Sequence, residues 1–136
     1  MDIDLKNLGN AKNTKKRVLV VDDNKDVCEF MKTAFSDEFE VDVSENAEGG
    51  LEKCAAWLPD LVLLDINLPG VNGIEFLRRM ALNQEISKIP VIVITASDFN
   101  GITESLARRH HNVSAFMTKL SPVGTIREHM LKALRG

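Results

Sequence analysis

The sequence has no tyrosine, few other aromatic residues, only two cysteines and no long apolar run. Aromatic residues make up 5% of the 136 positions while apolar residues make up 44%, so a folded core must be mainly aliphatic, as it is in parallel α/β sheets. No run approaches the roughly 20 apolar residues that a membrane-spanning helix needs, and the amino terminus lacks a signal-peptide apolar region. These absences predict a cytoplasmic protein that does not bind a membrane.

Neither the cysteines nor the charge points to a metal cluster, a disulfide framework or a nucleic-acid interface. Cys28 and Cys54 have no metal-ligand or redox-motif spacing, so we expect reduced thiols in the core. The net charge of −3 argues against direct binding of nucleic acid. The length fits a single domain, with residues 1–15 predicted to be a disordered or loosely packed tail and residues 16–136 the folded domain.

Five apolar or alternating segments predict strands, and four helical patterns separate them while a fifth follows the last. The helical pattern of residues 24–35 predicts that one face is buried. The segment 39–43 alternates at period two, as expected of a strand near a sheet edge, whereas residues 61–64 form an unbroken apolar run. This alternation predicts an α/β fold, a doubly wound five-stranded parallel (βα)5 sheet of the flavodoxin-like type with strand order 2-1-3-4-5. The expected strands are residues 17–21, 39–43, 61–64, 91–94 and 114–118, and the expected buried face of 24–35 is Val27, Phe30, Met31, Ala34 and Phe35.

Chemically active side chains follow four of the predicted strands. Asp22 and Asp23 follow the first strand, Asp65 follows the third, Thr95 ends the fourth and Lys119 follows the fifth. Because the carboxyl ends of parallel strands meet at one edge of the sheet, we expect these residues to form one site.

Three carboxylates at one site repel one another unless a cation neutralises them. Mg²⁺ is a hard cation that uses one or two carboxylates together with phosphate and water oxygens. A carboxylate at such a metal, beside a fixed ammonium and a hydroxyl, is suited to accept and hold a phosphoryl group. The predicted product is a phosphoaspartate, an anhydride prone to hydrolysis, which suits a switch.

The motifs VLVVDDN, LVLLDINLPGVNG, VIVITAS and FMTK, spread over about residues 16–135, together resemble the receiver domain of the response-regulator family. The likeness is to single-domain, chemotaxis-regulator-like receivers. It implies a signal-transduction role in a two-component regulatory system or phosphorelay. In that role Asp65 accepts phosphate from a histidine kinase or a histidine phosphotransfer protein.

The same resemblance implies roles for the other residues of the site. Asp23 and Asp65, with the Asn67 backbone carbonyl, would bind Mg²⁺, and Asp22 would do so through water. Thr95 and Lys119 match the family's hydroxyl and lysine positions. The remaining two assignments are Phe116, which matches an aromatic residue whose rotamer is coupled to phosphorylation, and Ala96, which matches a small residue beside the phosphoryl group.

One position departs from the family pattern. Receivers typically have a proline with a cis bond after the lysine, whereas Leu120 follows Lys119 here. A non-proline cis bond costs roughly 2.5–4 kcal/mol. We therefore expect this loop to be either strained or trans and differently placed.

Three other functions stay open beside a phosphorylatable module that switches a protein-binding surface. An aspartyl phosphatase, a true enzyme, usually needs an acid two residues after its nucleophile, where this chain has the amide Asn67. A flavodoxin-like cofactor binder disagrees with the acidic first strand end. A degenerate receiver that binds partners without phosphorylation is supported by Leu120. For the receiver we expect an output surface around residues 102–109, Phe116 and the last helix, an unknown downstream protein, and a monomer or weak dimer.

Overall fold

Five parallel strands form one sheet in the computed structural model of the chain, which describes residues 15–68, 72–95 and 101–135. The strand order is β2-β1-β3-β4-β5, as predicted. β2 and β5 therefore lie at the two edges of the sheet, and β3 lies at its centre. The strands are β1 (Arg17–Val21), β2 (Glu40–Ser44), β3 (Leu61–Leu64), β4 (Val91–Thr95) and β5 (Val113–Thr118).

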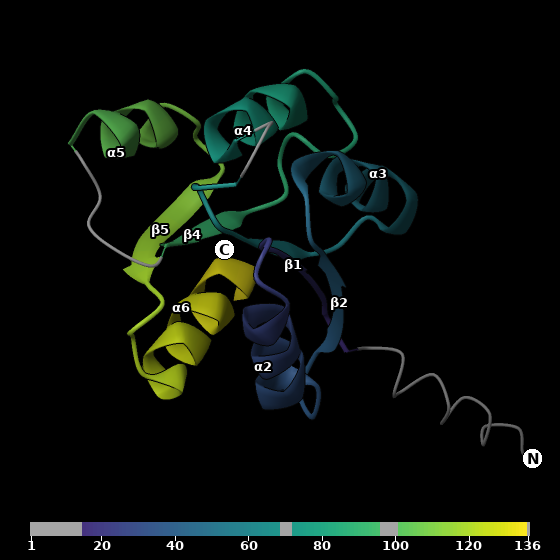
Figure 1. Ribbon diagram of the computed structural model, residues 1–136. Helices are drawn as coiled ribbons and strands as arrows, with labels where there is room; N and C mark the ends of the chain where they lie inside the picture. Colours follow the sequence, from purple (N-terminus) through teal and green to yellow (C-terminus); the bar gives the residue numbers. More distant parts are fainter. Residues whose placement is uncertain (1–14, 69–71, 96–100, 136) are drawn as a thin grey trace, which may run out of the picture.

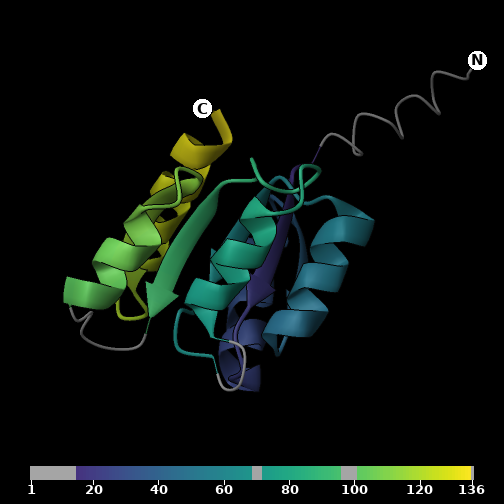
Figure 2. The ribbon, with the colours of Figure 1, turned by 90° about the horizontal axis from the view of Figure 1, so that it is seen from above.

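Helices cover both faces of the sheet (Figure 1). α2 and α6 lie on one face, and α3, α4 and α5 lie on the other, where Figure 2 shows them side by side in front of the strands. This is the doubly wound α/β arrangement that the sequence predicts. The helices are α2 (Lys25–Phe35), α3 (Ala47–Trp57), α4 (Gly73–Ala81), α5 (Gly101–Arg108) and α6 (Val123–Arg135).

The strands supply alternate residues to two aliphatic clusters, one under each layer of helices. In β3, Val62 and Leu64 join the cluster with α3 and α4, while Leu61 and Leu63 join the cluster with α2 and α6. All four side chains are buried, at 2% exposure or less. Each such burial stabilises the fold by about 1.5–3 kcal/mol, so the end of β3 is firmly held.

The buried face of α2 differs from the predicted one. Cys28, Met31 and Phe35 are buried, whereas Phe30 is 54% exposed and Ala34 is exposed. The helix is rotated so that Cys28 faces the sheet, where its thiol lies 3.2 Å from the Asp22 carbonyl oxygen. Both cysteines are free and buried, as predicted.

No helix within the described ranges is long and apolar enough to cross a membrane.

Candidate functional site

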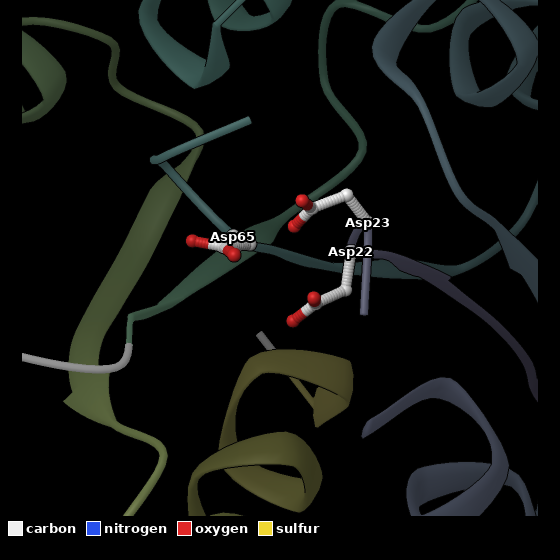
Figure 3. A group of neighbouring side chains, drawn as sticks. All are labelled: Asp22, Asp23 and Asp65. Carbon is white, nitrogen blue, oxygen red and sulfur yellow. The ribbon is translucent and has the colours of Figure 1, made fainter. Parts of the chain in front are cut away.

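Asp22, Asp23 and Asp65 meet at the carboxyl edge of the sheet (Figure 3). The backbone continues the sheet pattern at both strand ends, since Asp22 N–H donates to the Ser44 carbonyl (3.0 Å) and Asp65 N–H donates to the Val21 carbonyl (2.9 Å). Carboxylate oxygens of the three residues lie within 4.8 Å of one another. Asp22 and Asp65 are buried, and Asp23 is exposed at the mouth of the site.

Lys119, the residue directly after β5, contacts these carboxylates. Its ammonium lies 2.6 Å from Asp22 Oδ2 and 3.1 Å from Asp65 Oδ2, and its backbone N–H donates to the Thr95 carbonyl at 2.8 Å. The described residues contain no cis peptide bond, so the bond to Leu120 is trans. The trans alternative is thus the observed one, and it leaves the Lys119 ammonium in contact with both carboxylates.

The electrostatics of the Asp22–Lys119 pair have opposing causes. Burial raises the pKa of Asp22 and the Asp65 charge adds to this, although hydrogen bonds from Lys119 and the Asn24 N–H oppose them. Burial alone would lower the pKa of the Lys119 ammonium, but hydrogen bonds and charges of Asp22 and Asp65 hold it above its usual value. The ion pair would by itself lower the pKa of Asp22, so burial and the neighbouring Asp65 charge outweigh it at this carboxylate.

Thr95, at the end of β4, is 1% exposed. Its Oγ1 accepts a hydrogen bond of 2.8 Å from the side-chain amide of Asn67, whose backbone N–H donates to Asp65 Oδ1 at 2.9 Å. The sequence predicted Asn67 only through its carbonyl and missed this amide contact. Its position two residues after Asp65 was the available signal.

Asn24 is a second residue that the sequence analysis did not assign to the site. Its backbone N–H donates to Asp22 Oδ1 at 2.9 Å, and its side chain caps α2 by accepting from Asp26 and Val27 N–H. The cap therefore fixes α2 and orients the Asp22 carboxylate together. An asparagine directly after an acidic strand end was the signal.

The three carboxylates fit a divalent cation. With one ammonium the site has two net negative charges, and its donors are oxygens, which Mg²⁺ prefers. With metal–oxygen bonds of about 2.0–2.1 Å, ligand oxygens on one Mg²⁺ are at most ~4.2 Å apart. The carboxylate oxygens of the triad, which lie within 4.8 Å of one another, are close to this spacing. The acidic triad is consistent with a metal site.

The resemblance also assigns roles to Phe116 and Ala96, of which the structure describes only Phe116. Phe116, on β5, is partly buried against the cluster under α3 and α4, and the Arg108 guanidinium lies 4.6 Å from its ring centre. It does not belong to the acidic triad. Ala96 lies outside the described residues.

A small groove opens beside the acidic site. We call it the α2–α6 groove; it has a volume of about 220 Å³ and joins apolar side chains of both helices to Lys119. The exposed Phe30 is on its wall. The other lining residues used below are Val27, Met31, Val123 and Ile126.

Residues 18–130 match the family model described as the response regulator receiver domain. The chain belongs to this family. It is therefore a receiver, a signalling module of two-component systems rather than a conventional enzyme, and its acidic pocket is typical of a phosphoacceptor site. Receiver domains pair with histidine kinases.

Curated relatives agree with the family. The receiver is 31% identical over 119 residues to the KDP operon transcriptional regulatory protein KdpE of Escherichia coli (strain K12), covering 87% of this chain and 51% of KdpE. It is 36% identical over 81 residues to the response regulator ArlR of Staphylococcus saprophyticus, covering 59% of this chain and 36% of ArlR. The chain thus spans about half the length, or less, of these relatives.

Solved structures show the same fold. A CheY-like receiver domain protein of Methanospirillum hungatei JF-1 superposes with a TM-score of 0.82 at 23% identity, over 90% of this chain and 95% of that one. The chemotaxis protein CheY4 of Vibrio cholerae gives a TM-score of 0.81 at 16% identity, over 88% of this chain and 99% of that one.

Proposed function

We propose that this receiver accepts a phosphoryl group on Asp65 in a Mg²⁺-dependent reaction and that the phosphoaspartate switches a protein-binding surface. The observation that supports this most is the environment of Asp65. Its buried carboxylate lies 3.1 Å from a fixed ammonium and within 4.8 Å of two more carboxylates. A phosphoryl group on Asp65 would therefore lie next to one positive side chain, Lys119, and next to carboxylates whose charge a divalent cation would neutralise.

In the proposed reaction an Asp65 carboxylate oxygen attacks the phosphorus of a phosphohistidine. A phosphorus–oxygen bond forms while the phosphorus–nitrogen bond breaks, and the imidazole leaves with the electron pair and takes a proton from solvent. The Lys119 ammonium neutralises one phosphoryl oxygen, and the Thr95 hydroxyl donates a hydrogen bond to another. Mg²⁺, held by Asp23, Asp65 and the Asn67 carbonyl and through water by Asp22, would neutralise the remaining charge.

The proposed switch runs from Thr95 to β5. Thr95 pairs with Thr118 in the sheet, and Phe116 lies two residues earlier in that strand. A shift of Thr95 toward a phosphoryl group would move its partner strand β5 and so change the position of Phe116. Phe116 lies on the face formed by α5, β5 and α6. This face is the proposed output surface, for an unknown downstream protein.

The proposed partners are a histidine kinase or histidine phosphotransfer protein that acts in the cytoplasm. Leu120, the one support for a phosphorylation-independent binder, does not displace the Lys119 ammonium from Asp65.

The test is intact-mass measurement after incubation with acetyl phosphate, with and without Mg²⁺. We expect a Mg²⁺-dependent gain of one phosphoryl group in the wild type and in Asp37→Asn, an exposed control, and no gain in Asp65→Asn. A wild-type chain that stays unlabelled while its circular dichroism is native would overturn the proposal. It would favour the phosphorylation-independent binder.

A further inference from the structure

A second and larger groove lies between α5 and α6, along β5. Its volume is about 880 Å³. Ser114, Ala115 and Phe116 of β5 line it, together with residues of the second half of α6. Lys16 and Pro90, which also line it, directly precede β1 and β4, so the groove begins at the end of the sheet opposite Asp65.

Positive side chains surround this groove. We call it the basic groove. Among the described residues that line it, Asp60 is the one acidic residue, and its Oδ2 accepts a hydrogen bond from the Arg17 backbone N–H at 2.9 Å. Its basic and titratable lining residues are Lys16, Lys88, Arg108, His111, His129 and Lys132.

Three of the four lysine and arginine side chains that line the groove have no ion-pair partner among the described residues. Arg108 pairs with Glu104 at 2.8 Å. Lys16, Lys88 and Lys132 are exposed and have no ion pair with any residue in the described ranges. The chain as a whole has a net charge of −3, so three unpaired lysines around one groove form a local field opposite to that of the whole protein. Such a field attracts anions and raises their association rate.

The shape of the basic groove favours an extended chain over a compact ion. Its side includes three consecutive residues of β5. β5 is an edge strand, with β4 on one side and no strand of the described residues on the other. In Figure 1, β5 lies between α5 and α6. An edge strand can align an extended peptide along its length.

We propose that the basic groove binds an acidic, extended peptide segment of a partner protein. Acidic side chains of this segment pair with Lys16, Lys88 and Lys132, and its backbone lies along β5. This inference rests on the proposed function in one respect: the basic groove lies on the proposed output surface, and the inference adds the chemistry of the partner.

The test uses a fluorescein-labelled peptide of alternating glutamate and valine and the full chain, followed by fluorescence anisotropy. We expect saturable binding that weakens with added salt, and at least roughly tenfold weaker binding by Lys88→Glu/Lys132→Glu, since two attractive charges become repulsive. The control Lys25→Glu/Lys32→Glu makes the same charge change on α2 and is expected to bind as the wild type does. A matched glutamine–valine peptide should not bind.

Equal weakening by both double variants would overturn the proposal, because it would mean that only the overall charge matters. Tighter binding of a DNA duplex or of vesicles with anionic lipid than of the peptide would also overturn it, in favour of that class of partner. Acetyl phosphate labelling of the same variants separates the two proposals. If Asp65 is labelled and the peptide does not bind, only the basic-groove proposal fails. If the peptide binds and Asp65 is not labelled, only the phosphoacceptor proposal fails.

Discussion

The side-chain amide of Asn67 donates a hydrogen bond of 2.8 Å to the hydroxyl oxygen of Thr95. Asn67 lies in the loop after β3, and Thr95 is the last residue of the neighbouring strand β4. Thr95 is 1% exposed. The hydroxyl therefore has a protein partner in the resting site. Because the oxygen accepts in this contact, the same hydroxyl can donate to a phosphoryl group on Asp65 while it keeps the bond from Asn67.

We predict that Asn67→Ala lowers the free energy of unfolding by about 1 kcal/mol, because a buried hydroxyl loses its partner. The Asn67 N–H bond to Asp65 is a backbone contact and stays. Urea unfolding of Asn67→Ala, Thr95→Val and the double variant, without Mg²⁺, gives the coupling between the two residues. A coupling energy near zero would contradict a stabilising hydrogen bond.

Gly73, the first residue of α4, packs directly against the loop that follows Asp65. A Cβ at this position would lie 2.5 Å from the Ile66 Cα and 3.0 Å from the Ile66 carbonyl oxygen, and Gly73 N–H donates to that oxygen at 3.0 Å. We predict that Gly73→Ala destabilises the fold by roughly 1–3 kcal/mol. Because Ile66 is next to Asp65, we also expect slower labelling by acetyl phosphate.

Gly124 is the matched control for Gly73, since it also lies in a helix, α6. A Cβ there would meet no atom within 4 Å, so Gly124→Ala should stabilise the fold by up to about 1 kcal/mol. Thermal unfolding of the two variants should give midpoint shifts of opposite sign. A shift of the same sign in both would mean that the close approach at Ile66 is not what Gly73 provides.

The sheet and the acidic site could be predicted because both depend on short-range patterns. Apolar runs mark the strands, and parallel strands bring their carboxyl ends together whatever the loops do. Asp22, Asp23, Asp65 and Lys119 therefore meet as expected.

Two kinds of side-chain contact could not be predicted from the sequence: those that depend on how a helix is rotated about its axis, and those that depend on the conformation of a loop. The helical period of α2 was right, but Phe30 and Cys28 lie on nearly opposite sides of the helix, and only packing on the sheet decides which of them is buried. The amide of Asn67 reaches Thr95 from the loop after β3. Its position two residues after Asp65 places it near the site, but the loop conformation decides that its amide contacts Thr95.

The two buried thiols should be slow to react in the folded protein. Burial raises the pKa of Cys54 to about 12, and burial together with the Asp22 charge raises that of Cys28 to about 11, both from 9.0. At about pH 8, roughly one Cys28 thiol in a thousand is then a thiolate, against one in ten in the unfolded chain.

We therefore predict that a disulfide reagent labels neither cysteine quickly until urea unfolds the chain. Cys28→Ala and Cys54→Ala separate the two rates, and Cys28 should react faster than Cys54. Because the thiol pKa values are higher in the folded than in the unfolded chain, the unfolded thiols ionise first as pH rises above 9. The free energy of unfolding therefore falls as pH rises through this range. Rapid labelling in native buffer would contradict the burial of that thiol.

Phe30 is exposed beside Lys119, and this exposure has a predicted consequence for phosphoryl transfer. The α2–α6 groove provides apolar area at the entrance to the site, where a protein donor must approach to bring its phosphohistidine to Asp65. Acetyl phosphate is too small to cover this area. We predict that Phe30→Ala lowers the transfer rate from an autophosphorylated histidine kinase by roughly tenfold, which is the loss of one aromatic contact at an interface.

The measurement is the ratio of two rates, transfer from the kinase and labelling by acetyl phosphate. A change in the chemistry at Asp65 alters both rates alike and cancels in this ratio. Phe30→Ala should slow transfer from the kinase much more than labelling by acetyl phosphate. Leu82→Ala is the matched control, because Leu82 is 73% exposed and caps α4, away from the residues that line the groove. Its ratio should equal that of the wild type. If Leu82→Ala and Phe30→Ala change the ratio equally, the kinase does not dock at the α2–α6 groove; if neither changes it, the exposure of Phe30 has no part in recognition.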